Sequence, residues 1–232
     1  MFKKIWIVIG CFLFLQGCEG DEKIGLITNR KDDELMKEQL LIGVQQGDIH
    51  IVRQLIKEGV PINGQDAKGR TALMIATYEN DVEIAKVLID AGADVNVRDQ
   101  MKNNPFLYAG AEGYLEILQL TIVAGADPTI TNRYGGVALI PASEHGYVEV
   151  VKELLTNTAI NVNHVNNLGW TALLEAIILN DGNEKQQQIV QLLINHGADV
   201  NLPDHDKVTP LQHARKRGFK EIEKILLKAG AN

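Results

Sequence analysis

Apolar residues from about residue 34 to the end of the chain fall into pairs of short segments with helical spacing. In one clear pair, the apolar residues of 71–76 are followed by a second run from Val82 to Ile89, in which charged side chains alternate with groups of apolar ones. This spacing predicts two short helices, each with one buried face. One helix pair cannot cover its own apolar face, so we expect several pairs to stack on one another.

The pairs recur along the chain with a nearly constant period. Asp66, Asp99 and Asn132 stand 33 residues apart, and the next steps, to Asn166 and Asp204, are 34 and 38 residues long. Two insertions explain the longer steps, one residue near 160–161 and about five residues in 180–185. The period predicts an N-terminal cap at 34–65 and repeats at 66–98, 99–131, 132–165, 166–203 and 204–232.

Capping residues mark where the helices of each unit should begin and end. Threonine precedes three first helices, where its hydroxyl can accept from the backbone, and glycine follows the second helices. The threonines are Thr71, Thr171 and Thr209, and the glycines are Gly92, Gly125, Gly197 and Gly230. The third unit instead has Lys102 for glycine and Asn104 for threonine, and the fourth has Val137 for threonine, with Pro141 inside its first helix. We expect these two units to be the least stable.

The segment Thr209–Ala214 reads Thr-Pro-Leu-Gln-His-Ala, close to the ankyrin signature Thr-Pro-Leu-His-x-Ala. The segments 71–76 and 171–176 keep its Thr, Leu and Ala. From about Glu34 onward the chain resembles ankyrin repeats. That resemblance implies an all-α ankyrin-repeat solenoid of helix-turn-helix units joined by β-turn or hairpin loops.

The first residues have a different character. Lys3 and Lys4 precede an apolar run from Ile5 to Leu15, which is too short to cross a membrane stably and is typical of an export signal. The run ends in Leu-Gln-Gly-Cys, which resembles the lipobox of bacterial lipoproteins. We therefore expect residues 1–17 to be a signal peptide and Cys18 to carry the lipid; the alternative is a signal peptide with a cysteine there by chance. Residues 18–33 are polar and lack apolar periodicity, so we expect a flexible tether.

Two further features bear on location and partner. Glu19, not Asp, follows Cys18, and by resemblance to enterobacterial lipoproteins this favours the outer membrane, facing the periplasm. Loss of residues 1–17 removes Lys3 and Lys4 and no acid, changing the net charge from -7 to -9. An acidic body repels phosphate, so we expect no nucleic-acid partner, whereas a basic protein surface would be attracted.

The sequence lacks the patterns that would indicate catalysis. Ser143, Glu144 and His145 are adjacent and point to different sides of a helix, unlike a triad that converges in space. The six histidines are scattered over different units, and no phosphate-binding loop is present. Glu175 and His213 share one repeat position and could contact each other as a hydrogen-bonded pair. We therefore expect no catalytic, metal or cofactor site, and no enzyme.

The ankyrin resemblance also implies a binding face. In that family the loop tips and the exposed side of each first helix line a concave groove. The two tyrosines, one tryptophan and several aliphatic residues at these positions have the composition of a protein-binding patch. The candidate protein-binding residues are Lys68, Arg70, Tyr78, Glu79, Met101, Asn103, Glu112, Arg133, Tyr134, Glu144, His145, Leu168, Trp170, Ile178 and Leu179.

Among lipid-anchored bacterial ankyrin proteins, the chain resembles immunity proteins of type VI secretion phospholipase effectors. The resemblance implies a non-enzymatic module, monomeric when free, that is held at the membrane by its lipid and neutralises a secreted phospholipase by direct binding. The alternative is a general periplasmic scaffold or assembly factor for an envelope enzyme. A third possibility, an effector delivered to a host cell, conflicts with Cys18, since a lipid anchor retains the protein.

Overall fold

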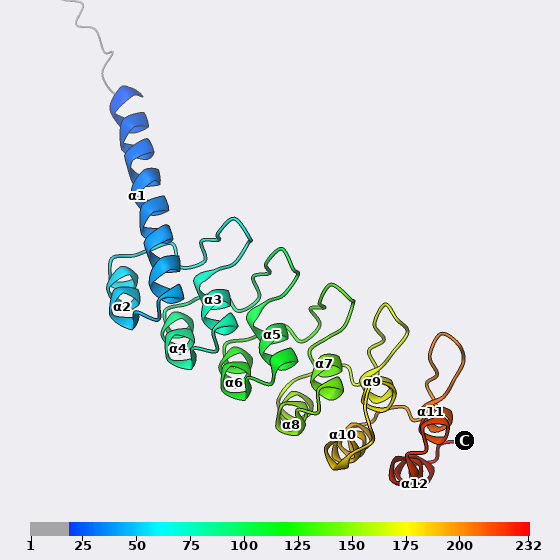
Figure 1. Cartoon of the computed structure of the whole chain (residues 1–232). Coiled ribbons are helices and arrows are strands. Elements are labelled where there is room, and N and C mark those ends of the chain that lie inside the picture. The colour runs from blue at the N-terminus through cyan, green and yellow to red at the C-terminus, as the bar shows by residue number, and fades with distance from the viewer. Residues whose placement is uncertain (1–18) are drawn as a thin grey trace, which may run out of the picture.

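The computed structural model describes the backbone of residues 19–232 and the side chains of residues 31–232. Helices stack in pairs along one direction, and the loops between pairs project to one side (Figure 1). The predicted all-α solenoid is confirmed, and the described residues form no strands, so the loops are turns and not paired hairpins. The helices are α1 (Glu19–Gln45), α2 (Ile49–Lys57), α3 (Ala72–Tyr78), α4 (Val82–Asp90), α5 (Pro105–Glu112), α6 (Leu115–Val123), α7 (Leu139–Glu144), α8 (Val148–Asn157), α9 (Ala172–Ile178), α10 (Glu184–Asn195), α11 (Pro210–Arg217) and α12 (Lys220–Lys228).

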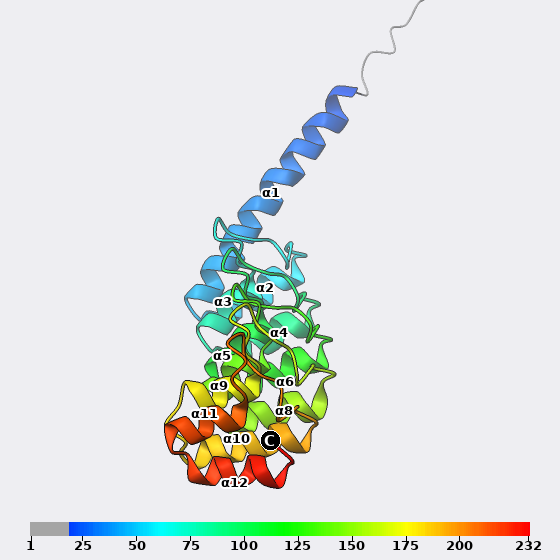
Figure 2. The same cartoon turned by 90° about the vertical axis from the view of Figure 1, so that its right-hand side faces the viewer.

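The helices form two rows. The inner row, α3, α5, α7, α9 and α11, lies beside the loops, and α2, α4, α6, α8, α10 and α12 form the outer row (Figure 1). Each inner helix packs against its own outer helix and against the inner helix of the next unit. The turned view shows α1 at one end of the stack and the C-terminus at the other (Figure 2). One core of buried side chains runs through all units, from Leu40 to Ala231, so each unit is stabilised by its neighbours.

The predicted threonine caps are confirmed. The Thr71 hydroxyl accepts from the backbone N–H of Met74 at 3.1 Å, and Thr171 caps α9 in the same way. Thr209 and Gln212 form a reciprocal capping box at the start of α11. In the third unit, Asn104 accepts from the Leu107 N–H at 2.8 Å. The change from Thr to Asn in that unit therefore keeps the cap, because an asparagine side-chain oxygen accepts the same hydrogen bond as a hydroxyl.

The fourth unit does lack its cap, as predicted. Val137 stands where the other units have Thr or Asn, and α7 is six residues long with no side-chain hydrogen bond at its start. Two loop tips are also strained. Lys102 and Lys207 have a φ of 64°, in the left-handed region, where the equivalent Gly69 and Gly135 have a φ of 75° and 74°. A side chain with a Cβ is disfavoured in this region, and glycine is not.

The first helix is longer than expected. Of the segment predicted to be an irregular tether, Glu19 to Asp33 is helical and continuous with the cap helix. No proline interrupts 19–45, and this stretch is rich in Glu, Lys and Leu, which favour helix without needing a buried face. None of the helices within residues 19–232 has both the length and the apolar character needed to cross a membrane. Cys18 and the expected signal peptide lie outside the described residues.

Candidate protein-binding groove

One loop motif recurs in every unit after the first and orients the loop tips. In the second unit, Asp66 Oδ1 accepts from the backbone N–H groups of Lys68 and Arg70, both at 2.8 Å. In the fifth, Asn166 Oδ1 accepts from Leu168 and Trp170, both at 3.0 Å. Asn132 and Asp204 make both corresponding bonds in their loops, and Asp99 makes the second of them, from the Asn103 N–H. The spacing of Asp and Asn found in the sequence is therefore the spacing of these turns.

The second polar atom of the same Asp or Asn fixes a side chain on an inner helix. Asn166 Nδ2 donates to Glu175 Oε1 at 2.8 Å, and Asp204 Oδ2 contacts His213 Nε2 at 2.7 Å. Glu175 and His213 each bind the loop of their own unit, so the expected pair between them is wrong. The reason is that each of these side chains lies closer to the loop Asp or Asn of its own unit than to the equivalent side chain of the next unit.

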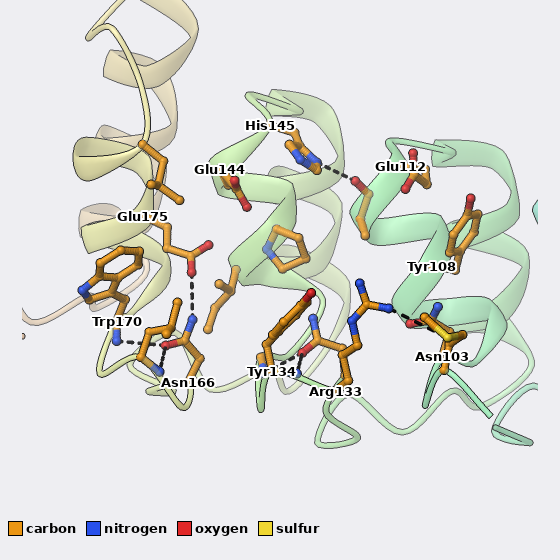
Figure 3. A pocket seen from close by; sticks show the side chains of 18 of the residues that line it. Asn103, Tyr108, Glu112, Arg133, Tyr134, Glu144, His145, Asn166, Trp170 and Glu175 are labelled. Carbon is orange, nitrogen blue, oxygen red and sulfur yellow. Dashed lines mark hydrogen bonds between the residues drawn. The ribbon is translucent and has the colours of Figure 1, made fainter. Parts of the chain in front are cut away.

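The loops and the inner helices α5, α7 and α9 enclose a hollow of about 650 Å3 on the concave side (Figure 3). We call this hollow the groove. Eleven of the fifteen residues proposed from the sequence line it. They are Tyr78, Met101, Asn103, Glu112, Arg133, Tyr134, Glu144, His145, Leu168, Trp170 and Leu179. The structure thus brings together residues from four successive units, and their role in binding stays a prediction.

The other four proposed residues lie outside the groove. Lys68, Arg70 and Glu79 belong to the second unit, toward the N-terminal end of the array. Arg70 forms an ion pair with Asp66 at 2.7 Å. Burial raises the pKa of Asp66, but the hydrogen bonds from Arg70 and Lys68 outweigh it and lower that pKa below its ordinary value. Ile178 faces a separate hollow beside α11, lined also by basic side chains.

Several residues that line the groove were not proposed from the sequence. They are Tyr108, Ala111, Asn132, Gly136, Ile140, Pro141, Asn166 and Glu175. Three of them, Tyr108, Pro141 and Glu175, stand nine residues after the loop Asp or Asn of their own units. A position that is Tyr, Pro and Glu in successive units is not serving the apolar core, and this variation was the signal available in the sequence.

Aromatic side chains form much of the groove wall. Tyr78 and Tyr108 meet edge to face with ring centroids 4.4 Å apart, and the guanidinium of Arg133 lies 4.7 Å from the centre of the Tyr134 ring. The Tyr78 hydroxyl donates to Asp99, at 2.5 Å. Burial, together with the Asp99 carboxylate, raises the pKa of Tyr78 to about 12. These contacts fix the rings in place before any partner arrives.

Glu175 is the most unusual charged group of the groove. Only 5% of the residue is exposed. Burial raises the pKa of Glu175 to about 7, the nearby Glu144 carboxylate adds to this rise, and the bond from Asn166 opposes it. The groove as a whole is not simply acidic, because Arg133 also lines it.

The side chains of residues 143–145 do not converge. Ser143 is fully buried, and its hydroxyl donates to the Leu139 carbonyl at 2.8 Å. His145 Nδ1 lies 2.8 Å from the Ala111 carbonyl oxygen, on the rim of the groove (Figure 3). Among residues 31–232, no three His, Cys, Asp or Glu side chains are grouped closely enough to hold a metal ion.

Comparison with known proteins places this geometry in a family. A model of ankyrin repeats in three copies matches residues 23–99 and 106–204. YahD of Escherichia coli strain K12, described as an ankyrin repeat protein, is 62% identical over 81 residues, which are 35% of this chain and 40% of the length of YahD. The match therefore spans less than half of that relative.

Solved structures extend the similarity over most of the array. An ankyrin repeat domain from Acinetobacter baumannii AYE is 54% identical, with a TM-score of 0.82, covering 83% of this chain and 98% of that one. The ankyrin repeat protein EF0377 is 40% identical, with a TM-score of 0.80, covering 84% and 98%. Ankyrin repeat domains are typically non-catalytic modules that bind other proteins. The family model and these two structures show that the chain belongs to the ankyrin repeat family.

Proposed function

We propose that this chain is a lipid-anchored immunity protein of the bacterial envelope, which binds a secreted phospholipase through the groove and so prevents its action on the membrane. The observation that carries the binding function is the groove itself. It is a concave hollow with several aromatic residues at the centre of an ankyrin array. Aromatic residues contribute disproportionately to protein interfaces, and those in the middle of an interface contribute most.

The size and rigidity of the groove support a specific contact. Its loops are fixed by hydrogen bonds within each unit and by bonds between units, such as Asn167 N–H to the Tyr134 carbonyl at 3.0 Å. Side chains that are already ordered lose little conformational entropy when a partner binds. One tight partner is therefore a better fit to this surface than many weak ones, which favours an inhibitor over a general scaffold.

The envelope location rests on Cys18 and the residues before it. A lipid on Cys18 would hold the array at the surface of the membrane that a phospholipase attacks, and α1 would separate the array from that surface. Glu19 after the cysteine favours the outer membrane, with the array in the periplasm. Stable anchoring of this kind brings inhibitor and toxin to the same two-dimensional surface, which raises their effective concentration.

An enzyme assay tests the immunity function. The purified chain is added to the type VI phospholipase effector of the same strain, and fatty-acid release from phosphatidylethanolamine vesicles is measured. We expect release to stop near an equimolar ratio. Unchanged release, together with no complex on gel filtration, would contradict the immunity function. Several weakly bound envelope proteins in place of one would favour the scaffold.

Photo-crosslinking tests whether the partner binds on the groove side of the array. A benzophenone amino acid is placed at Tyr134 in the groove or, as a matched control, at Lys152, which is exposed on the outer helix α8 of the same unit. We expect the partner to be captured from position 134 and not from position 152. Capture from position 152 alone would place the binding surface on the outer helices.

A further inference from the structure

Glu175 lies in the groove with a carboxylate whose hydrogen bonds and charge are only partly matched by neighbouring groups. One oxygen, Oε1, accepts from Asn166 Nδ2 at 2.8 Å. Its other oxygen points away from Asn166, toward the side on which Glu144 lies, and no donor within the described residues reaches it (Figure 3). Only 5% of the residue is exposed, and no cationic side chain within the described residues pairs with it. A buried charge of this kind is costly unless it is paired.

The glutamates around it add negative charge. Glu112 and Glu144 also line the groove, and within the described part of the chain neither they nor Glu175 form a salt bridge. The mutual repulsion of Glu144 and Glu175 contributes to the raised pKa of Glu175. The one arginine of the groove, Arg133, contacts Met101 Sδ at 3.9 Å and lies over Tyr134. The Glu144 and Glu175 side of the groove therefore lacks its counter-charge.

Aromatic rings flank the same space. Trp170 follows the loop turn held by Asn166, and Tyr134 lies across from it in the neighbouring unit (Figure 3). The contact of Arg133 with the Tyr134 ring at 4.7 Å shows that a guanidinium fits against an aromatic face here. A guanidinium can stack on an aromatic ring while donating to carboxylates in its plane, whereas an ammonium group cannot do both equally well.

We propose that the groove receives an arginine side chain presented by the bound protein. Glu175 and Glu144 accept hydrogen bonds from its guanidinium, and Trp170 and Tyr134 hold its plane. This inference deepens the proposed function and rests on it, since the arginine belongs to the protein partner. It predicts that the partner has an arginine at the centre of its contact surface, where charge pairs removed from water contribute most to specificity.

A titration of the full chain tests this without the partner. N-acetyl-arginine amide is the probe, N-acetyl-citrulline amide is its uncharged analogue, and the NMR signal of the Trp170 indole N–H is followed. We expect the arginine probe to shift this signal at millimolar concentrations and to bind about tenfold or more tightly than citrulline. Glu175→Gln should weaken the arginine probe about tenfold or more and leave the citrulline analogue unchanged. Glu116→Gln, which removes the same charge from the exposed surface of α6, is the control and should not alter binding.

Three results would overturn the inference. Equal binding of arginine and citrulline would show that the charge is not recognised, and equal binding of N-acetyl-lysine amide would show that the guanidinium is not. No shift of the Trp170 signal at any attainable concentration would exclude the site. If that result is found while crosslinking from position 134 still captures the partner, the arginine site fails and the proposed binding face stands. Capture from position 152 alone would instead refute the binding face itself.

Discussion

The free energy of unfolding should depend on pH through Glu175 in a direction opposite to that of an ion-paired carboxylate. The pKa of Glu175 rises from 4.5 to about 7 in the folded chain, chiefly through burial. Between these values the folded chain holds a proton that the unfolded chain has released. The contribution of this residue to stability therefore falls as pH increases through that window and is constant above it.

Glu175→Gln removes this dependence because the amide is never charged and its oxygen can still accept from Asn166. A rise in pKa from 4.5 to about 7 corresponds to at most about 3 kcal/mol, at roughly 1.4 kcal/mol per pKa unit. The variant should therefore gain up to about 3 kcal/mol over the wild-type chain. The gain should grow between about pH 4.5 and pH 7, be more than half complete at pH 6, and be constant above about pH 8.

Urea unfolding followed by circular dichroism measures the difference at several pH values. Other carboxylates also titrate in this range, so the quantity to compare is the wild-type value minus that of the variant at each pH. Glu116→Gln, from the exposed face of α6, is the control for loss of one negative charge. A difference that does not change with pH would refute the argument that Glu175 is buried without compensation. A difference of the opposite sign would mean that a cation already pairs with it.

Four other substitutions have definite expected outcomes. Val137→Thr should stabilise the array by about 1 kcal/mol in urea unfolding, since it restores the missing cap of α7. Thr171→Val, which removes a cap at the equivalent position, should destabilise the array by about as much. If both substitutions changed the stability in the same direction, the capping argument would be contradicted. Lys102→Gly should stabilise by roughly 0.5 kcal/mol, because relief of the left-handed strain exceeds the added entropy of the unfolded chain, and a loss of stability would show that the Lys102 side chain makes a contact that matters. Cys18→Ala should abolish incorporation of a clickable fatty acid, and a variant that still takes up label and remains with membranes would contradict lipidation at that residue.

The period of the chain and its capping residues predicted the stacked helix pairs, and the resemblance of Thr209–Ala214 to the ankyrin signature implied the fold. Asp66, Asp99 and Asn132 recur because each closes the same turn, and Thr71 precedes an inner helix because its hydroxyl caps it. The helical start of α1 at Glu19 was not predicted, since this stretch has no apolar periodicity and its helix is explained by local propensity. Apolar periodicity predicts helices that bury one face against a core. It does not predict a helical segment that extends away from the core.

The groove was only partly predictable. Loop-tip residues such as Tyr134 and Trp170 follow from the register of the repeat. Glu175 and Tyr108 do not, although the change from Tyr to Pro to Glu at their shared repeat position indicates that this position lies outside the apolar core. Sequence spacing placed Glu175 and His213 at one repeat position but could not show that each binds its own loop. Which partner each side chain bonds depends on the distances between the folded side chains, and these are not given by sequence spacing.

The affinity of Trp170→Ala for the captured partner tests the central claim most directly. Trp170 lines the groove and is half-buried in the free chain. Truncation of a tryptophan that a partner covers commonly costs about 2 to 4 kcal/mol, so binding should weaken by about 30-fold to 1000-fold. Lys86→Ala, on the outer helix α4, should bind as the wild-type chain does, and both variants should melt near the wild-type temperature. The account is contradicted if Trp170→Ala binds with unchanged affinity, or if its melting midpoint falls by several degrees while the folded fraction binds normally.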